Sequence, residues 1–450
     1  MTEQHLALAV NGRENRLVER LTALSQDAHD ASGPMSVAVV GLGYVGLPTA
    51  CGLRSPGART VGLDTSHQRL RDVAVGDVDL PEDDRRALLA SIQDGDFRLT
   101  ADESALSDVD AVIVCVPTPV DDRRQPDLSS LRRACAGVVE HAHRGQTIVL
   151  SSTTFAGTTR ELLIEPLAER GLVVGRDVFV AFSPERIDPG NLDHVPRQTP
   201  RIVGGATAAC ADRAGGLIGR MTDAVYLVGS PEAAELTKLY ENVFRAVNLA
   251  LANEVADVCS GLGLDPVEVT LAAGTKPYGF LGSMPGPGVG GHCIPCDPHY
   301  LLWQLRRDNL SAPLIEEAMR AIENRPMRVV RRVGEVLAAA GSGIRGARVL
   351  LVGASYKPGV RDVRESPAIP IMTELVTSGA RVGYHDPLVP EVELADGTAL
   401  RGEEQPDAGR WDLVVVHTVH PGCDYTWVRD CPRILDATYQ FDIAHHRQLV

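Results

Sequence analysis

The stretch "SVAVVGLGYVGLPTACGL", residues 36–53, changes character in its middle. It begins as a short run of β-branched residues, breaks at Gly41, Gly43 and Gly46, and continues with residues that favour a helix. This order predicts a buried strand, a tight turn and a helix. At G-x-G-x-x-G spacing, glycines let backbone N–H groups and the helix N-terminus approach a pyrophosphate.

An acidic residue at the end of the next predicted strand strengthens this interpretation. Asp64 closes "TVGLD", 18 residues after Gly46, and its carboxylate can accept hydrogen bonds from both hydroxyls of a ribose. Its charge would repel a 2′-phosphate, so the sequence favours NAD over NADP. Arg69 lies five residues further on, where it can either stack on adenine or be an ordinary surface arginine.

Further apolar runs alternate with helical patterns up to about residue 228. They are "VDAVIVCVPTP", "TIVLSSTTFAGTT" and "DVFVAFSPERIDPGN". The alternation predicts a doubly wound parallel sheet. Thr118 and Thr153 stand at the carboxyl ends of two of these strands, where such sheets bind ligands, although each can equally be an ordinary capping residue.

The pattern then becomes one long helix, with Ser230 as N-cap, Pro231 at the first position and Gly261 as the expected stop. About 30 residues at 1.5 Å each give a length of roughly 45 Å, which suits a spine between two domains. Strand and helix patterns return near residue 341. We therefore expect an α/β protein with two doubly wound parallel-sheet domains joined by a long central helix. The expected parts are an N-terminal extension (1–34), a dinucleotide-binding domain (35–228), a central helical region (229–340) and a smaller α/β domain (341–450).

The composition argues against several classes of protein. Of the 450 residues 44% are hydrophobic, which is enough for two or three buried cores. The net charge is −15 and no block of Lys or Arg stands out, so we expect no nucleic-acid partner. No apolar run approaches 18 residues and the start lacks a signal-peptide layout, so we expect no membrane partner and a cytoplasmic location. Nine cysteines, mostly single, suit reduced thiols.

The segment "GVGGHCIPCDPHY", residues 288–300, allows three kinds of site. A zinc site needs a second ligand pair, and no second C-x-x-C or H-x-x-x-H appears. A dithiol redox pair should open a helix directly after a strand, whereas here glycines precede it and "DP" comes next, which we expect to resist helix formation. The third interpretation, which we favour, is a single nucleophile, Cys293, with a carboxylate at Asp297. The first two remain alternatives.

Polar residues on the long helix fit such a nucleophile. Lys238, Asn242 and Arg245 fall at i, i+4 and i+7 and therefore share one face. Burying such polar side chains costs free energy, which favours a functional role for them. A nearby cation would stabilise a reactive thiolate. A hydrated stripe with structural salt bridges is the alternative.

Together these motifs resemble those of the nucleotide-sugar 6-dehydrogenases, the UDP-glucose/GDP-mannose dehydrogenase family. The likeness runs from about Ser36 to about Asp436, through "GLGYVGLPTA", "CVPTP", "SPERIDPGN", "ELTKLYENVFRAVNLALANE", "GPGVGGHCIPCDP" and "YKPGVRDVRESPA". The resemblance implies two Rossmann-like domains, a homodimer formed through the long helix, and oxidation of a sugar C6 alcohol to a carboxylate with two NAD+. It also implies that the first domain binds NAD, that residues 229–340 carry the dimer contact and the catalytic loop, and that the last domain binds the UDP-sugar.

The resemblance assigns roles to individual residues. Cys293 would capture the C6 aldehyde as a thiohemiacetal, and the resulting thioester would be cleaved by water. Lys238 would stabilise the oxyanion. Asn242 would donate to the same oxygen or hold the water with Asp297, and Glu185 would help to deprotonate that water. The implied cofactor contacts include Tyr44, Val45 and Arg364. The implied substrate contacts are Arg186, Ile187, Lys238, Asn242, Arg245, His292 and Lys357.

The substrate is suggested by three segments. "SPERIDPGN", "GGHCIPCDP" and "GTKPYGF" resemble the UDP-N-acetylhexosamine branch of the family, to which we tie Arg186 and His292. The first expected substrate is UDP-N-acetylglucosamine. UDP-glucose, UDP-N-acetylmannosamine and GDP-mannose are alternatives, as is a non-catalytic nucleotide-sugar-binding relative. Two departures are Cys296, which could form a disulfide with Cys293, and Gln440, which stands where the family often has a basic residue.

Overall fold

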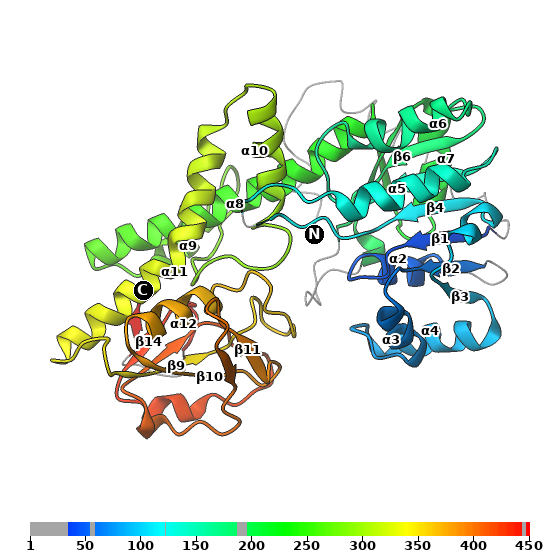
Figure 1. Cartoon of the computed structure of the whole chain (residues 1–450). Coiled ribbons are helices and arrows are strands. Elements are labelled where there is room, and N and C mark those ends of the chain that lie inside the picture. Colours follow the sequence, from blue (N-terminus) through cyan, green and yellow to red (C-terminus); the bar gives the residue numbers. More distant parts are fainter. Residues whose placement is uncertain (1–34, 55–58, 122, 187–195, 443–446) are drawn as a thin grey trace. The chain divides into compact units, whose positions relative to one another are not determined.

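The computed structural model describes residues 35–54, 59–121, 123–186, 196–442 and 447–450 (Figure 1). The predicted N-terminal extension lies outside these residues. The chain divides into two compact units, one up to Leu239 and one from Tyr240, which we call the N-terminal and C-terminal units. This division lies inside the predicted central helical region, and the four-part organisation stays a prediction.

The N-terminal unit is built on an eight-stranded sheet of order β3-β2-β1-β4-β5-β6-β7-β8. Its first six strands pair in parallel, as the alternation predicts. Figure 1 shows β4, β1, β2 and β3 side by side. The strands are β1 (Val37–Val40), β2 (Thr60–Leu63), β3 (Phe97–Thr100), β4 (Ala111–Val114), β5 (Thr147–Leu150), β6 (Phe179–Phe182), β7 (Arg201–Gly205) and β8 (Val225–Val228).

The sheet reverses direction once, which the sequence did not indicate. β6 and β7 pair antiparallel, with Phe182 opposite Gly204. A parallel neighbour needs a crossover, usually a helix. Between these strands the described residues contain only a short 3₁₀ turn, η4 (Pro196–Gln198). β8 then pairs with β7 in parallel, after the helix α7 (Ala208–Ile218).

Two helices of this unit, α3 (His67–Val75) and α7, begin with a side-chain cap. Ser66 accepts a hydrogen bond from the backbone of Arg69, and Thr207 does the same for Cys210, so two otherwise unpaired N–H groups are satisfied. The remaining helices are α2 (Gly46–Gly52), α4 (Glu82–Asp94), η2 (Glu103–Asp108), α5 (Ser129–His141), η3 (Arg160–Ile164) and α6 (Glu165–Glu169).

The long helix is α8 (Pro231–Leu262). The side chain of Ser230 accepts from the backbone of Ala233 at 3.2 Å, which confirms the predicted N-cap. The predicted stop at Gly261 is wrong by two residues. The helix closes at Gly263, whose φ of +71° is the left-handed conformation that ends helices, whereas Gly261 lies in the last turn.

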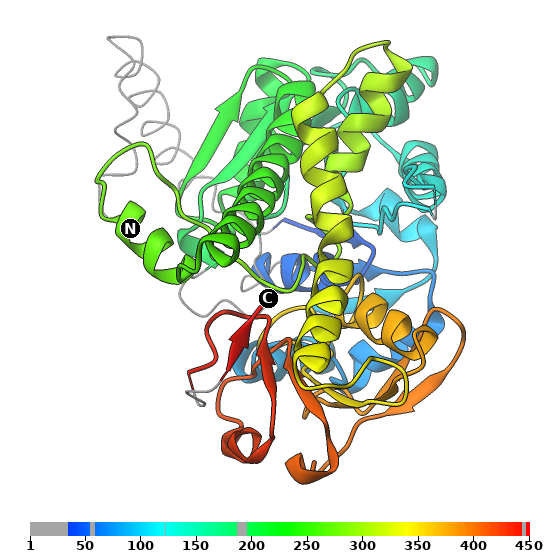
Figure 2. The same ribbon diagram turned by 90° about the vertical axis from the view of Figure 1, so that its left-hand side faces the viewer.

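The C-terminal unit contains a second parallel sheet, of order β10-β9-β13-β14-β15. Figures 1 and 2 show α11 and α12 packed together beside it. Its strands are β9 (Arg348–Val352), β10 (Arg381–His385), β13 (Leu413–Val416), β14 (Ile434–Asp436) and β15 (Gln448–Leu449), with a separate hairpin of β11 (Glu391–Glu393) and β12 (Ala399–Arg401). Its helices are α9 (Pro266–Gly274), α10 (Asp297–Arg307), α11 (Pro313–Ala339), α12 (Ala368–Thr377), η5 (Ala408–Arg410) and η6 (Thr426–Asp430).

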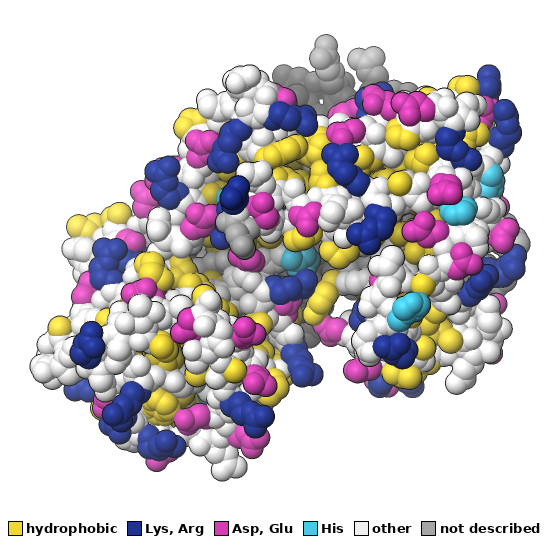
Figure 3. Space-filling model, viewed as in Figure 1, with side chains coloured by type: hydrophobic (Ala, Val, Ile, Leu, Met, Phe, Trp, Pro, Cys, Tyr) yellow, Lys and Arg dark blue, Asp and Glu magenta, His cyan; other side chains and the backbone are white. Residues whose placement is uncertain are grey.

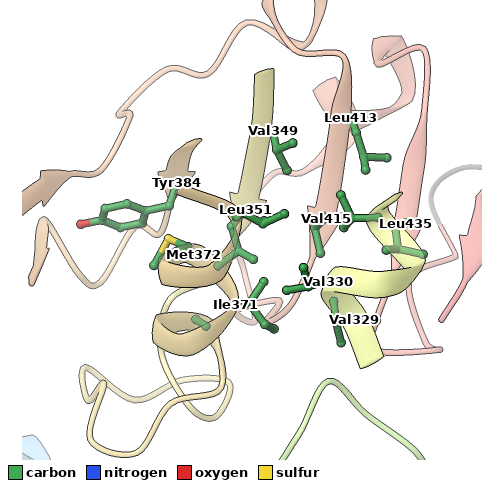
Figure 4. Close-up of a cluster of buried hydrophobic side chains, with 14 of the residues drawn as sticks. Val329, Val330, Val349, Leu351, Ile371, Met372, Tyr384, Leu413, Val415 and Leu435 are labelled. Carbon is green, nitrogen blue, oxygen red and sulfur yellow. The ribbon is translucent and has the colours of Figure 1, made fainter. Parts of the chain in front are cut away.

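Alternation along β9 builds a core on each face of this sheet. Val349 and Leu351 face one side, where they join apolar side chains of α11 and α12 (Figure 4). Leu350 and Val352 face the other, where they pack with Trp411. Each fully buried side chain of this size stabilises the fold by about 2 kcal/mol. The two cores fix the strand register and thus the loops at the carboxyl edge.

Candidate active site

The glycine turn after β1 has the geometry expected of a dinucleotide site. Gly41 has a φ of +89°, and a Cβ on Gly46 would lie 1.7 Å from the Gly41 carbonyl oxygen, so both positions require glycine. A Cβ on Gly43 would meet nothing within 4 Å. The backbone there is open to a ligand, and α2 begins at Gly46 immediately behind it. Half-buried Val45 and the more exposed Tyr44 flank this opening.

Asp64 is held at the edge of the same turn. Its Oδ2 accepts from the backbone of Leu42 and its Oδ1 from the backbone of Ser66, each at 2.8 Å. Arg69 donates from Nε to the Leu42 carbonyl at 2.7 Å, so it is anchored above the turn and is not a free surface side chain. Gly41 and Asp64 line a cavity of about 90 Å³. The open backbone at Gly43 and the carboxylate of Asp64 therefore fit the pyrophosphate and the adenosine ribose of a dinucleotide.

Two strand ends supply the other expected cofactor contacts. Thr118 comes after β4 and Thr153 after β5, and both are half-buried. The carboxyl ends of parallel strands meet at one edge of the sheet, which is the ligand-binding edge of such folds. Arg364, the remaining expected cofactor contact, belongs to the C-terminal unit, and its role stays a prediction.

Glu185 stands in a buried polar cluster within the N-terminal unit. Its Oε2 lies 2.5 Å from Nη1 of Arg201 and 3.5 Å from the hydroxyl of Thr49. Lys238 donates from Nζ to the backbone carbonyl of Glu185 at 3.2 Å, so two of the expected catalytic residues meet. Sequence reasoning missed Arg201, which lies at the start of β7 and carries no motif of its own.

Arg186 continues this cluster. Its backbone N–H donates to Oε1 of Glu185 at 2.8 Å, and its Nη1 donates to the Pro200 carbonyl, also at 2.8 Å. Ile187, the next expected substrate contact, lies outside the described residues.

Cys293 and Asp297 lie at the start of α10 in the C-terminal unit. The Cys293 carbonyl accepts from the backbone of Cys296 at 3.2 Å and of Asp297 at 2.8 Å, which forms the first turn. The expectation that "DP" resists a helix is therefore wrong. Pro298 occupies the first turn, where its missing N–H costs nothing because that N–H would have no helical partner. One argument against a dithiol pair is thus removed.

Within this turn the two sulfurs differ in exposure. Cys293 is half-buried, whereas Cys296 is buried at 7% exposure. Asp297 is only 2% exposed, and its Oδ2 accepts a hydrogen bond from the amide of Asn242 on α8. The structure therefore brings together Asn242, Asp297 and Cys293 in the C-terminal unit, and presents Cys293 as the accessible thiol.

The glycines before Cys293 let the loop approach Tyr356 closely. A Cβ on Gly291, whose φ is +84°, would lie 2.8 Å from the Tyr356 ring, and the backbone N–H of Gly291 donates to the Arg364 carbonyl at 3.0 Å. Buried Arg325 donates to the Gly286 carbonyl, also at 3.0 Å. These contacts fix the loop on the C-terminal unit.

The expected substrate contacts of this unit lie around the same loop. Nη2 of Arg364 lies 3.4 Å from Nδ1 of His292, while Asp362 holds the guanidinium at 2.6 Å. Lys357 is half-buried and Arg245 is exposed on α8. Their contacts with a substrate stay predictions.

A cavity of about 470 Å³ opens beside the loop, at the carboxyl edge of the second sheet. Its wall combines aromatic and hydroxyl groups with His417, whose pKa is lowered to about 4 by burial, so that its ring is neutral at pH 7. Such a wall suits a nucleoside better than a free anion, since none of the described lining residues is Lys or Arg. The lining residues are Pro285, Gly286, Pro287, Gly288, Tyr356, Pro358, Pro367, His417, Thr418, Val419, Thr438, Gln440, Phe441 and Asp442.

Three further observations concern the described residues only. Among them, no three His, Cys, Asp or Glu side chains gather in a way that could hold a metal ion. No helix in this part of the chain is both long and apolar enough to cross a membrane. On the face drawn in Figure 3, basic and acidic side chains are interspersed.

Three consecutive segments of the chain are similar to known proteins. Residues 35–222 match the NAD binding domain of the UDP-glucose/GDP-mannose dehydrogenase family, residues 232–324 match its central domain, and residues 350–446 match its UDP binding domain. The chain belongs to the UDP-glucose/GDP-mannose dehydrogenase family. It is therefore an NAD-dependent oxidoreductase of nucleotide sugars.

Individual family members extend this likeness over most of the chain. A UDP-N-acetyl-D-glucosamine 6-dehydrogenase of Pseudomonas aeruginosa is 31% identical, over 86% of this chain and 90% of the relative. A UDP-N-acetyl-D-mannosamine dehydrogenase of Pyrococcus horikoshii is 35% identical over the same shares. The solved structure of the UDP-D-ManNAc dehydrogenase from Pyrococcus horikoshii aligns with a TM-score of 0.83 at 30% identity, covering 92% of this chain and 98% of that one.

Proposed function

We propose that this dehydrogenase oxidises the C6 hydroxyl of a UDP-N-acetylhexosamine to a carboxylate, with UDP-N-acetylglucosamine as the first candidate. The observation that carries the proposal is the turn that opens α10. It presents the thiol of Cys293 while Asn242 holds the carboxylate of Asp297 one helical turn away. A dehydrogenase that stops at an aldehyde has no need of a nucleophile beside a buried, oriented carboxylate.

NAD supplies a hydride acceptor for each of the two oxidations, and the glycine turn with Asp64 is the site that fits it. The residues of the chain do the rest. Cys293 adds through sulfur to the C6 aldehyde and holds it as a thiohemiacetal, which becomes a thioester when C6 is oxidised again. Water then attacks the thioester carbon, the C–S bond breaks, and the carboxylate leaves while the thiol is restored.

The charged groups are proposed to act on these covalent steps. Lys238 stabilises the oxyanion, because a cation lowers the energy of negative charge that develops in a site shielded from water. Asp297 orients and deprotonates the attacking water, and Asn242 fixes the rotamer of Asp297. Glu185 assists from the cluster with Arg201, which holds its carboxylate in place.

The proposal is tested by the yield of NADH at 340 nm with excess NAD+ and limiting nucleotide sugar. UDP-N-acetylglucosamine, UDP-N-acetylmannosamine, UDP-glucose and GDP-mannose are compared. We expect two NADH per UDP-N-acetylhexosamine consumed, and no two-NADH yield from Cys293→Ala. Cys423→Ala, at an exposed cysteine outside the site, is the matched control. One NADH with accumulating aldehyde in the wild type would contradict the role of Cys293, and no NADH from any of the four sugars would contradict the substrate class.

The same assay tests the substrate assignment. Arg186 and His292 are the residues proposed to favour the N-acetyl group. We expect His292→Ala to raise KM for the N-acetylated sugar more than KM for UDP-glucose. Equal changes in both would remove His292 from the recognition of the sugar.

We also propose that the enzyme is a homodimer formed through α8. Exposed apolar side chains recur along it at spacings of four and seven residues, which places them on one stripe. A stripe of this length is unusual on a monomer, and a second copy of the same helix would cover it. The stripe consists of Tyr240, Phe244, Leu251, Val258 and Leu262.

The solution mass tests the dimer. We expect light scattering to give twice the 48.1 kDa of the chain, and Leu251→Glu together with Val258→Glu to give the single mass. Leu314→Glu, at an exposed leucine of α11 outside the stripe, should leave the dimer intact. A wild type at 48.1 kDa would overturn the proposal.

A further inference from the structure

Glu235 is a buried carboxyl group that the proposed chemistry does not use. It lies on α8, one turn before Lys238, and its residue exposure is 0%. Within the described part of the chain, no Lys or Arg forms an ion pair with it. A buried carboxylate without a cation is costly unless several hydrogen-bond donors surround it.

The donors come from the loop between β5 and η3. The backbone N–H of Gly157 donates to Oε2 of Glu235 at 2.6 Å. The backbone N–H and the hydroxyl of Thr159 donate to Oε1 at 2.8 Å and 2.6 Å. Three donors from one loop thus converge on a single side chain of the helix that carries Lys238.

This loop also carries Thr153, the expected cofactor contact at the end of β5. Its start is tied to the sheet, because the hydroxyl of Ser152 donates to the Val116 carbonyl at 2.9 Å. Its far end is tied to α8 through Glu235. The segment that presents Thr153 is therefore anchored at both ends, by the hydrogen bond from Ser152 to the sheet and by the carboxylate of Glu235.

We propose that Glu235 is a positioning residue that holds the loop of residues 151–159 in the conformation that receives NAD. The proposal rests on the cofactor role of Thr153. As a carboxylate, Glu235 offers only acceptors, which match the three donors. When it is protonated, its own O–H faces an N–H group, the contact with Gly157 is lost, and the loop is released.

We expect this contact to depend on pH in the neutral range. Burial raises the pKa of Glu235 to about 7. The hydrogen bonds from Thr159 and Gly157 act against this rise, whereas the nearby negative charge of Glu232 adds to it. The charged side chains nearest to Glu235 and Thr159 along the chain have other partners. Arg160 of η3 donates to Glu232 at 2.8 Å, and Lys238 donates to the Glu185 carbonyl at 3.2 Å.

The test is the dissociation constant of NAD+ between pH 6 and pH 8.5, measured by titration calorimetry on the full chain without nucleotide sugar. If the ionised form is the competent one, affinity at pH 6 is about tenfold weaker than at pH 8, because only about a tenth of the molecules carry the carboxylate. Glu235→Gln should bind NAD+ with the weak affinity at every pH. Loss of this pH dependence is not what a merely structural side chain would produce.

Glu232→Gln is the matched control, since Glu232 links the same helix to the same segment but contacts neither Gly157 nor Thr159. We expect it to keep the inflection, moved towards lower pH because the negative charge of Glu232, which raises the pKa of Glu235, is removed. Thr159→Val is a milder variant in case Glu235→Gln does not fold. It removes one donor to the carboxylate and should therefore move the inflection to higher pH.

Three results would overturn the proposal: an unchanged inflection in Glu235→Gln, an unchanged inflection in Thr159→Val, or its loss in Glu232→Gln. Since NAD+ binding is measured without sugar, these results are independent of whether a UDP-N-acetylhexosamine is oxidised. A chain that oxidises no sugar but shows the predicted profile contradicts the proposed function alone.

Discussion

The two large sheets of this enzyme begin in the same way, with parallel strands around a glycine turn, but differ in what comes after that turn. In each, a buried strand ends at a left-handed glycine, Gly41 with φ +89° and Gly353 with φ +88°. In each, an acid after the neighbouring strand accepts from the backbone just beyond that glycine. Asp64 accepts from Leu42 at 2.8 Å, and Asp386 accepts from Ala354 at 2.7 Å.

The two turns differ in the segment that comes after the glycine and in the other partners of the acid. In the N-terminal unit α2 begins at Gly46, whereas in the C-terminal unit the next helix begins only at Ala368. Asp64 is half-buried beside a cavity. Asp386 is 5% exposed and lies 3.1 Å from Nε2 of His420. We therefore expect the shared frame to bind a dinucleotide only where a helix N-terminus comes at once after the glycine and the acid remains accessible.

The largest expected effect separates the two glycine turns. Gly43→Val should weaken NAD+ binding about a thousandfold, because its side chain fills the open space that the pyrophosphate needs, while the melting temperature stays unchanged. Calorimetry with NAD+ measures the first and thermal unfolding the second.

The counterpart is Gly353→Ala. Its Cβ would lie 2.1 Å from the Thr418 carbonyl oxygen, so the C-terminal unit should lose stability while NAD+ affinity is kept. All three tryptophans of the chain lie in that unit, so their fluorescence reports its unfolding. If Gly353→Ala weakened NAD+ binding as much as Gly43→Val does, the division of labour between the turns would be wrong.

The second effect concerns the buried acid. Asp386→Asn should lower the unfolding free energy of the C-terminal unit by about 3 kcal/mol at pH 7, since it leaves His420 and several backbone donors without a charged partner. Despite burial, hydrogen bonds from His420 and from the backbone of Ser355 and Leu388 hold the pKa of Asp386 well below its ordinary value.

The sign of the pH dependence depends on that direction. A depressed pKa in the folded state gives stability that is fully present above the unfolded value of about 3.9 and is lost as pH falls below it. The wild type and Asp386→Asn should therefore differ in urea unfolding at pH 7 and converge towards pH 2. A gap that stays constant down to pH 2 would show that the charge of Asp386 is not the cause.

The third effect tests the accessible acid. Asp64→Asn should weaken NAD+ binding about tenfold and narrow the preference over NADP+, because the amide loses one acceptor and the negative charge that repels a 2′-phosphate. Dissociation constants for both cofactors measure this. Asp386→Asn is the control and should leave both constants unchanged, since Asp386 is buried and lies in the other unit from the cavity that Asp64 lines.

Local patterns predict much of this architecture. The strand, glycine turn and acid at residues 36–64 and the cap of α8 at Ser230 are legible in the sequence because each depends on neighbours within a few tens of positions. The helix that begins at Asp297 is not predicted, because the proline of "DP" is interpreted as a helix breaker. Proline is tolerated in the first turn of a helix.

Other parts depend on contacts that no local pattern encodes. Arg201 reaches Glu185 only because β7 runs antiparallel to β6, and the sequence does not predict that reversal either. Glu235 looks like an ordinary helix residue until the loop after β5 folds onto it. The sequence therefore predicts the residues that belong to motifs. The contacts that support them can be identified only from the three-dimensional structure.

The smallest effect tests whether the two sheets also share the pairing at their amino edges. Asp110 precedes β4 and accepts from the backbone of Ser36 at 2.8 Å, just as Asp412 precedes β13 and accepts from the backbone of Arg348 at 2.8 Å. The backbone hydrogen bond from Ser36 lowers the pKa of Asp110, whereas the pKa of Asp412 is lowered first by the side chain of Arg348 and then by its backbone N–H. Asp110→Asn and Asp412→Asn should each cost up to about 1 kcal/mol, since both sites are partly exposed to solvent.

The two variants should report through different probes. Asp412→Asn should shift the tryptophan transition, whereas Asp110→Asn should shift only the unfolding of the N-terminal unit, measured by circular dichroism. Each loss should fade as pH falls below about 3.9, because both folded pKa values are depressed. If Asp412→Asn cost clearly more than Asp110→Asn, the ion pair with Arg348, at 2.8 Å, would be the stabilising contact. Equal costs would assign the effect to the backbone hydrogen bond that both sheets share. The same contact would then fix the strand register in both sheets.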